Sequence, residues 1–472
     1  MSQADQDTPR EAWSSRFAFF YACAAASIGL GSLWRFPYVA GQNGGGAFVL
    51  LFLLFIFALC VPLMMAEMLI GRRGGGSAIL SVGNMIRGEK AMGAWAAIGW
   101  LSILIPFLGL SYYSVVAGWG LDYVREAITH GFAGLSGAQS EARFGALATD
   151  WVRQGTMQAL LIAAVAVVVA LGVQRGIEWV SRIKMAGLVI IILGLVGYGY
   201  ATLDFGRAVD FLFKPDFSKL TADSVLQALG QAMFSTSVGV GVIMTYAAYQ
   251  PVRMPLGRTA LAINSSVAVV ASLAGLAIFP AVFTYGLKPG GGPSLIFVTL
   301  PAAFAKMPGG QWVAILFFTM IVLAAFTVMV GMLEPVVAWV REKTGLSRPV
   351  AASVTAAACF AVGLPSLLST SLLKDWHPLA AVKGFETKTF FDVLDFFIGN
   401  IIIPVNALLI ALFVGWCVSR RTVDEELSLK GVVELAWRGI VMFVAPLLIT
   451  ILMLSLIFPD QAKALMASLS GH

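Results

Sequence analysis

The chain has 472 residues, of which 59% are hydrophobic and only 12% are charged. Soluble domains carry roughly 25% charged residues, so water is not the main solvent of this protein. The formal net charge of +6 comes without a basic cluster interleaved with aromatic residues, which gives no support to nucleic-acid binding. The four cysteines lie singly in apolar stretches, so neither a disulfide framework nor a cysteine metal site is expected.

Apolar stretches of about 20 residues, the length that crosses a hydrocarbon core of about 30 Å, recur along nearly the whole chain. They predict an all-α integral membrane protein with eleven transmembrane helices in a single domain, residues 1–472. The polar start of the chain has no signal-peptide pattern, so the first helix is expected to direct insertion. The predicted spans are 17–40, 46–71, 93–128, 157–173, 179–203, 223–250, 259–287, 311–342, 350–371, 390–419 and 434–458.

The loop charges predict an orientation. If the N-terminus is cytoplasmic, more than half of the Lys and Arg residues fall on the inner side, among them Arg72, Arg175 and Lys184, as the positive-inside rule requires. An odd number of spans then places the C-terminus outside. We expect a multi-pass protein of the bacterial inner membrane, in contact with the lipid bilayer, as a monomer or a weak homodimer. Residues 290–308 are too short and too rich in Gly and Pro to span, so they predict an outer re-entrant or lid loop.

A five-residue pattern occurs in both the first and the sixth span, as Ser-Ile-Gly-Leu-Gly at 27–31 and Ser-Val-Gly-Val-Gly at 237–241. Paired glycines weaken a helix, and lipid tolerates the freed backbone groups only where they line a cavity. Matching interruptions predict two inverted repeats around a binding site at the middle of the membrane. Repeat one is expected over about 17–203 and repeat two over about 223–419, with a peripheral helix over about 434–458. The alternative is that these glycines only allow close helix packing.

Two broken helices would also define the chemistry of the site. A break exposes backbone N–H groups that attract an anion and carbonyl groups that attract a cation. A zwitterion beside a metal cation suits such a field, so the sequence favours a carrier of an amino-acid-like solute. A membrane enzyme is disfavoured, because single cysteines and histidines outside the spans supply no catalytic cluster. A substrate sensor with a transporter fold is a further alternative.

The residues of the first two spans resemble the start of the neurotransmitter:sodium symporter family, whose bacterial members have the LeuT fold. The resemblance is carried by Gly29-Leu30-Gly31-Ser32-Leu33-Trp34-Arg35-Phe36-Pro37-Tyr38, Asn43-Gly44-Gly45-Gly46-Ala47-Phe48 and Pro62-Leu63-Met64 with Glu67. It continues in Tyr112-Tyr113, Gln231 to Tyr246, Asn264, Glu334-Pro335 and Asp395, and so covers nearly the whole chain. It implies a 5+5 inverted repeat with helices 1 and 6 broken, and sodium-coupled uptake by alternating access.

The resemblance also implies a substrate site. A substrate carboxylate would bind the backbone of Leu30 and Gly31 and the hydroxyl of Tyr113. Monoamine carriers of the family have an aspartate where this chain has Gly29, so the substrate is expected to bring its own carboxylate. Glycines at pocket positions predict room for a medium or large, apolar or aromatic amino acid, unless neighbouring side chains fill the space. The implied substrate-binding residues are Ser27, Leu30, Gly31, Gly109, Tyr113, Phe234, Ser235, Ser237, Val240, Val328, Gly331 and Met332.

One or two sodium ions are implied as coupling ions, and hard cations prefer oxygen ligands. In the first site Ser32 and Ser235 stand where relatives have asparagine and threonine. In the second site Val328 replaces the usual serine or aspartate and cannot coordinate an ion. Weak binding with water, coupling to a single sodium ion, or a contribution from protons are therefore all open. The implied ligands are Ala25, Ser27, Ile28, Ser32, Ser235, Asn264, Ala324 and Thr327.

Charged residues within spans need partners or water, and several match the gates of the family. Arg35 and Asp395 are expected to meet above the substrate as the outer gate, the alternative being a static buried ion pair. The inner gate is expected to contain Arg10, Trp13, Tyr249 and Glu342.

Overall fold

The computed structural model describes residues 11–250, 254–287, 295–458 and 461. Over these residues the protein is helical, without a β-strand. Nine of the described helices are long and apolar enough to cross a membrane, and one bent pair adds a tenth. The predicted all-α membrane fold is confirmed, but the count of eleven spans is not. The predicted sixth span consists of two short helices, α11 (Ala222–Thr236) and α12 (Val242–Ala248).

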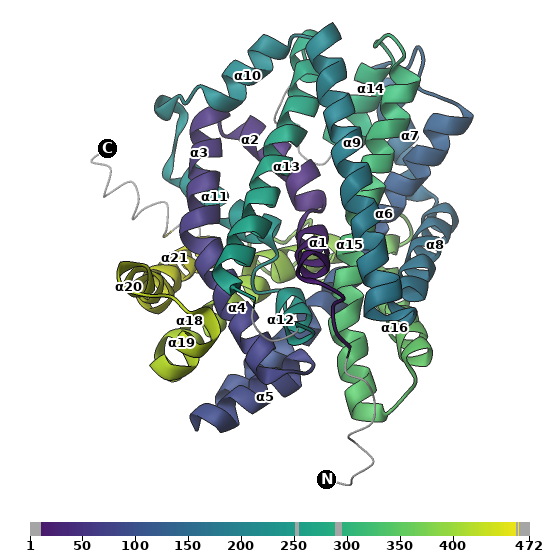
Figure 1. The fold of residues 1–472 in the computed structure, drawn as a ribbon. Helices are drawn as coiled ribbons and strands as arrows, with labels where there is room; N and C mark the ends of the chain where they lie inside the picture. The colour runs from purple at the N-terminus through teal and green to yellow at the C-terminus, as the bar shows by residue number, and fades with distance from the viewer. Residues whose placement is uncertain (1–10, 251–253, 288–294, 459–460, 462–472) are drawn as a thin grey trace.

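The long helices lie close to the predicted spans and run side by side as a bundle (Figure 1). Their rise of 1.5 Å per residue lets about 20 residues cross the membrane. They are α3 to α4 (Gly46–Gly74), α6 with its first 3₁₀ turn (Gly93–Thr129), α8 (Trp151–Ala170), η5 to α9 (Val173–Thr202), α13 (Leu256–Thr284), α15 (Gly310–Thr344), α16 (Arg348–Leu368), α17 to η9 (Phe390–Cys417) and α20 to α21 (Val432–Ile457).

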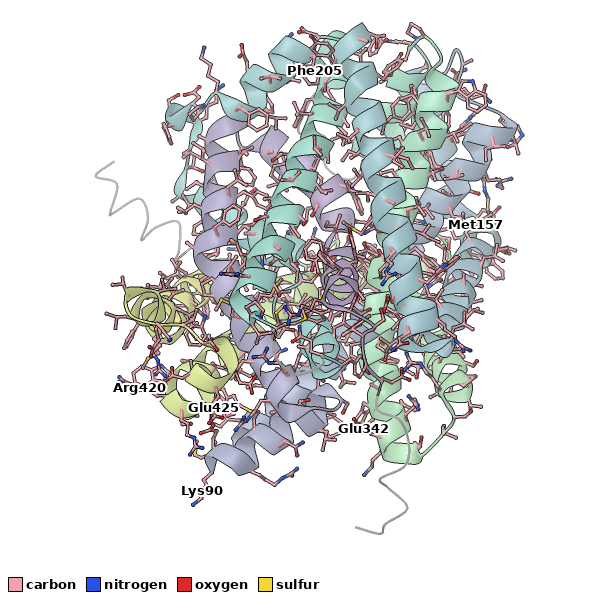
Figure 2. All side chains as sticks on the ribbon, in the orientation of Figure 1. Lys90, Met157, Phe205, Glu342, Arg420 and Glu425 are labelled. Carbon is pink, nitrogen blue, oxygen red and sulfur yellow. The ribbon has the colours of Figure 1, made fainter. Side chains whose placement is uncertain are left out.

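Shorter helices connect the long ones at the two ends of the bundle. In Figure 2, Lys90, Glu342, Arg420 and Glu425 lie at the end near the start of the chain, and Phe205 lies at the opposite end. The connecting helices are α5 (Ala78–Glu89), α7 (Gly137–Thr149), α10 (Phe205–Phe213) and α19 (Arg420–Leu427).

Five π-helical segments share one local cause. A proline stands two residues after the last residue of each segment. Proline has no N–H to donate, and its ring crowds the carbonyl four residues earlier, so the helix locally widens to π geometry. The segments are η2 (Gly31–Arg35), η3 (Ile56–Cys60), η7 (Leu295–Thr299), η8 (Ile398–Ile402) and η10 (Ile440–Val444), and the prolines are Pro37, Pro62, Pro301, Pro404 and Pro446.

Both predicted interruptions are present. The first separates α1 (Arg16–Ser27) from η2 and α2 (Phe36–Gln42), with a bend of 52°. The second separates α11 from α12 at residues 237–241, where Ser237, Gly239 and Gly241 have φ angles of 57°, 83° and 95°. This left-handed region favours glycine. A Cβ on Gly241 would also lie only 2.4 Å from the carbonyl oxygen of Ser102, so no side chain fits there.

The two breaks lie next to each other in the interior. α1 packs against α12, and η2 packs against α11, while α6 and α15 run alongside. The last long helix is peripheral, because only 28% of its apolar window is buried, against 67% for Gly310–Thr344. The assignment of the two halves to inverted repeats remains a prediction.

The predicted re-entrant loop is described from Leu295 onward, as η7 followed by α14 (Leu300–Phe304). The part of the prediction before residue 295 lies outside the described residues. Phe297 is buried, and its carbonyl oxygen accepts a hydrogen bond from the Tyr123 hydroxyl at 2.6 Å. Its ring lies 6.1 Å from the ring of Trp34, in η2. This segment therefore packs against the half-helix that follows the first break.

Candidate functional site

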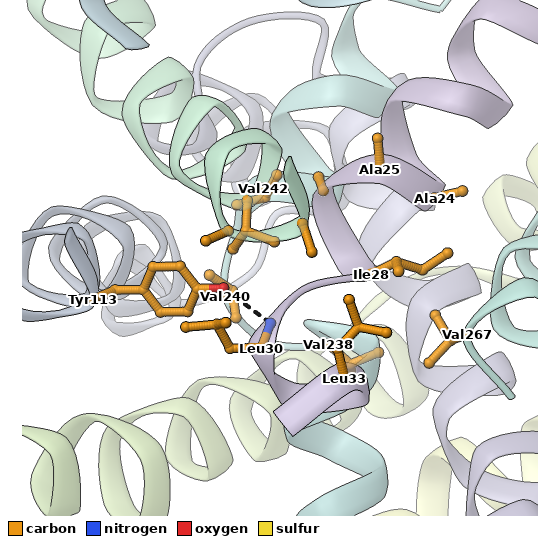
Figure 3. Close-up of a cluster of buried hydrophobic side chains, with 14 of the residues drawn as sticks. Ala24, Ala25, Ile28, Leu30, Leu33, Tyr113, Val238, Val240, Val242 and Val267 are labelled. Atoms are coloured by element: carbon orange, nitrogen blue, oxygen red, sulfur yellow. Dashed lines mark hydrogen bonds between the residues drawn. The ribbon is translucent and has the colours of Figure 1, made fainter. Parts of the chain in front are cut away.

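A cavity lies where the two breaks meet. Its empty volume, which includes space open to the surroundings, is about 480 Å³. Figure 3 shows part of its wall, with Leu30, Tyr113 and Val240 side by side. The lining residues are Ser27, Gly29, Leu30, Gly31, Ile105, Gly109, Tyr112, Tyr113, Phe234, Ser237, Val240, Val328, Met332, Ile398 and Ile403.

Most of the predicted substrate-binding residues line this cavity, and two do not. Ser235 is buried beside it and accepts a hydrogen bond from the Gln231 side chain at 2.8 Å. Gly331 does not widen the cavity, because a Cβ there would lie 2.9 Å from the Cβ of Ala26 and 3.2 Å from Val242. It serves the close packing of α15 against α1 and α12.

The sequence reasoning did not place five of the lining residues in the pocket. Gly29 and Tyr112 stand inside the motifs that carry the resemblance, so that signal was available. Ile105, Ile398 and Ile403 are apolar residues of membrane helices, and nothing in the sequence distinguishes them from lipid-facing neighbours.

One end of the cavity is polar backbone. The N–H of Leu30 donates a hydrogen bond to the hydroxyl of Tyr113 at 3.1 Å, as Figure 3 shows. A Cβ on Gly29 would lie 2.5 Å from Cγ2 of Val328 and 2.9 Å from the Tyr113 hydroxyl oxygen. The absence of a side chain at Gly29 therefore lets Val328 and Tyr113 approach the first break closely.

The predicted first sodium site contains buried oxygens without partners. Among the described residues, Ser27 Oγ, Ser32 Oγ and Asn264 Oδ1 are buried and accept no hydrogen bond. Buried polar atoms are nearly always paired in proteins, so these oxygens are available to a cation. Ser32 belongs to η2, which packs against α13, the helix of Asn264. The residues present fit a sodium ion.

The predicted second sodium site has a different occupant. The Nζ atom of Lys184 donates hydrogen bonds to the carbonyl oxygens of Ala25, at 3.1 Å, and Ile28, at 2.7 Å. The Thr327 hydroxyl also donates to Ala25, at 2.9 Å, and contacts the carbonyl oxygen of Ala324 at 3.4 Å. Lys184 was counted among the inner loop cations, but it is only 1% exposed. The residues present do not fit a second sodium ion.

The expected outer gate residues do not form a direct ion pair within 4.0 Å. The guanidinium carbon of Arg35 lies 4.7 Å from the centre of the Phe234 ring, a cation–π contact. Asp395 is exposed, and among the ion pairs of the described residues none joins it to Arg35. Asp395 interacts instead with the hydroxyl of Tyr112, and its charge is close enough to that of Arg35 for the two to attract each other.

The expected inner gate residues contact other partners. Trp13 donates from its ring to the carbonyl oxygen of Tyr246 at 2.9 Å, and from its backbone to that of Tyr249 at 3.2 Å. Glu342 accepts a hydrogen bond from the backbone of Ser77 at 2.6 Å. Arg10 lies outside the described residues, so its pairing with Glu342 stays a prediction.

A buried ion pair lies beside the inner gate residues, and the sequence reasoning did not anticipate it. Glu334 is fully buried and pairs with Arg348 at 2.5 Å, while the Tyr249 hydroxyl donates to the same carboxylate at 2.8 Å. Glu11 also contacts Arg348, at 3.1 Å. Together with the Trp13 contacts, they join the start of α16 to α15 and to the end of α12.

Membrane-length helices, two breaks around one cavity and unpaired buried oxygens beside it define a membrane transporter. The comparisons with known proteins agree. Residues 10–142 and 141–466 match the model of the sodium:neurotransmitter symporter family. The chain is 38% identical to an uncharacterized sodium-dependent transporter, YhdH of Bacillus subtilis, over 94% of this chain and 97% of that protein. It is 31% identical to a second such transporter, from Haemophilus influenzae, over 95% and 98% of the two chains.

The fold is also similar to that of a solved transporter. The crystal structure of MhsT in complex with L-phenylalanine matches with a TM-score of 0.85 and 34% identity, over 95% of this chain and 100% of that chain. The chain therefore belongs to the sodium:neurotransmitter symporter family. It is a multi-pass, sodium-dependent transporter with the LeuT fold, and not an enzyme.

Proposed function

We propose that this protein imports a medium or large, apolar or aromatic amino acid by sodium-coupled symport with alternating access. The observation that carries the proposal is the cavity at the two breaks, whose wall is apolar apart from backbone groups and a few hydroxyls. The similar transporter MhsT has been crystallised with L-phenylalanine, a ligand of this class. Met332, whose side chain would contact a Cβ on Gly109 at 3.6 Å, bounds the size of the substrate.

The substrate carboxylate would bind at the start of η2. The Leu30 N–H now donates to the Tyr113 hydroxyl, so a carboxylate that displaces this hydrogen bond would gain a donor from each group. The amino end of a helix also favours negative charge. No protein carboxylate stands at Gly29, so the substrate supplies this charge.

Sodium would travel as a co-substrate in the first site, held by Ser32, Asn264, the backbone of Ser27 and the substrate carboxylate, with Ser235 close by. The three unpaired oxygens described above support this assignment. A shared carboxylate couples the two solutes, because each one strengthens the binding of the other.

Alternating access would require the two ends of the bundle to open in turn. The Trp13, Tyr249, Glu334 and Arg348 contacts would have to separate to release substrate inward, and Arg35 and Asp395 would have to come into direct contact to close the outer side. We place the protein in the bacterial inner membrane with the N-terminus in the cytoplasm, as the loop charges predict.

Uptake into proteoliposomes tests the function. The purified protein is reconstituted, a sodium gradient and a proton gradient are imposed separately, and radiolabelled amino acids are supplied one at a time. We expect uptake of L-phenylalanine or another large apolar amino acid, driven by sodium and lost in Asn264→Ala. Uptake of glycine and alanine alone would contradict the substrate class. Binding without flux would select the sensor, and flux driven only by protons would select the proton-assisted carrier.

A further inference from the structure

The side chain of Lys184 reaches the carbonyl end of the first half-helix. Lys184 lies in α9 and is 1% exposed, whereas its neighbour Ile183 is 51% exposed. Its side chain therefore points into the bundle, where α9 packs against α1. The Nζ atom lies 2.7 Å from the oxygen of Ile28 and 3.1 Å from that of Ala25. Figure 3 shows Ala25 and Ile28 at this end of α1.

These two carbonyls are ligands of the second sodium site that the family resemblance implies. The last carbonyls of a helix have no partner within the helix, and a lysine side chain near a helix end can satisfy them. An amino nitrogen at hydrogen-bonding distance from both oxygens takes their lone pairs and the space between them. A sodium ion cannot share that position.

The other residues of the second site also supply too few free oxygens to bind a cation. Val328 offers no oxygen at the position where the family resemblance implies a serine or an aspartate. The Thr327 hydroxyl, 3% exposed, directs its proton to Ala25. By contrast, the first site keeps buried oxygens that lack partners within the described residues. The first predicted sodium site therefore has oxygens free to bind an ion, whereas the oxygens of the second site are already paired.

We propose that the amino group of Lys184 permanently replaces the second sodium ion, so that the transporter binds one sodium ion per chain, at the first site. The lysine ties α9 to the end of α1 at the break, whereas an ion held by Ala25, Ile28, Ala324 and Thr327 would tie α1 to α15. This inference rests on the proposed function, since it specifies the number of coupling ions.

The stoichiometry of the unmodified protein is the primary test. Purified protein in detergent is titrated with radioactive sodium in a scintillation proximity assay, with and without saturating L-phenylalanine. We expect one sodium ion per chain and a sodium dependence without cooperativity. Two sodium ions per chain would overturn the proposal.

Removal of the lysine is the second test. The double variant Lys184→Met, Val328→Ser vacates the carbonyls and adds the missing oxygen, so it should bind one sodium ion more than the unmodified protein. Lys306→Met, at an exposed lysine after α14, is the matched control and should match the unmodified protein. If the folded double variant binds no additional sodium, lysine does not exclude the ion and the proposal fails. Lys184→Gln with Val328→Ser keeps N–H donors for the carbonyls and replaces the first variant if that one does not fold.

The assay separates this inference from the proposed function. If the unmodified protein binds no sodium and the double variant binds one ion, sodium coupling at the first site is lost while the role of Lys184 stands. If L-phenylalanine and other large amino acids are not transported but the two stoichiometries differ as expected, only the substrate assignment fails.

Discussion

The carboxylate of Glu67 accepts a hydrogen bond from the backbone N–H of Gly239 at 2.9 Å, although Glu67 belongs to α4 (Val61–Gly74) and Gly239 to the second break. The same carboxylate accepts from Gly241 at 3.1 Å and from Met244 at 3.3 Å. The first N–H groups of a helix have no partner within it. A side chain from another helix therefore caps α12 and stabilises the break.

Removal of this cap should destabilise the protein. Glu67→Ala leaves backbone N–H groups unpaired in the interior, and we expect a loss of about 3 kcal/mol in the free energy of unfolding, since each such group costs about 1–3 kcal/mol. Glu67→Gln keeps one acceptor and should lose less. The midpoint of thermal aggregation in detergent measures the effect, with Glu141→Ala at an exposed position of α7 as control. Equal midpoints for Glu67→Ala and the control would show that the cap carries no stability.

The breaks were predictable from the sequence because their cause is local. Paired glycines recur at 29–31 and 239–241, and the structure interrupts the helix at both places. The ends of the spans were also predictable, because each span is a local stretch of apolar residues long enough to cross the membrane. The predicted sixth span is not among the membrane-length helices, because its two pieces, α11 and α12, are each too short. Glu67 as the cap of the second break could not be inferred, since its partners are more than 170 residues away.

The hydroxyl of Tyr113 should matter for substrate binding. Its removal also takes away the acceptor of the Leu30 N–H, so the amount of folded variant is measured first. Tyr113→Phe removes one donor to the substrate carboxylate, and hydrogen bonds to charged groups contribute about 1.5–3 kcal/mol. We expect the KM for amino-acid uptake to rise about tenfold, which corresponds to about 1.4 kcal/mol. Uptake kinetics in proteoliposomes measure it, with Tyr200→Phe, 74% exposed, as control. An unchanged KM would remove Tyr113 from the substrate site.

Gly29 should not tolerate even one methyl group. A Cβ would lie 2.5 Å from Cγ2 of Val328, so Gly29→Ala forces α1 and α15 apart at the cavity. We expect uptake to fall about tenfold or more, equivalent to about 1.4 kcal/mol. Gly29→Ala with Val328→Ala, which removes the nearer clashing atom but leaves the Tyr113 hydroxyl 2.9 Å away, should recover part of the loss. Gly206→Ala, where nothing lies within 4 Å of the new Cβ, is the control. Failure of the second substitution to restore any uptake would point to a backbone cause instead.

Residues that act across the bundle were hidden for a physical reason. Lys184 lies near a span end in the sequence, where the positive-inside rule assigns lysines to a loop, yet its side chain is long enough to reach the interior. Arg348 likewise follows a short loop but turns inward to Glu334. The pattern of charges along the chain predicts on which side of the membrane the backbone of a residue lies. It does not give the direction of a flexible side chain.

Substitutions of Glu334 and Arg348, which form a buried ion pair, should have strongly non-additive effects on the free energy of unfolding. Arg348→Met leaves a buried carboxylate without its partner, which typically costs about 3–5 kcal/mol. Arg348→Met with Glu334→Met removes both charges, so we expect it to be clearly more stable than Arg348→Met alone. The exposed pair Arg421 and Glu425 is the control and should show little coupling in the same double-mutant cycle, because surface ion pairs are screened by water. Thermal unfolding of the unmodified protein, of Arg348→Met, of Glu334→Met and of the double variant measures the coupling. Additive effects at Glu334 and Arg348 would mean that Tyr249 and water already satisfy the carboxylate, and that the inner end opens without breaking a strong ion pair.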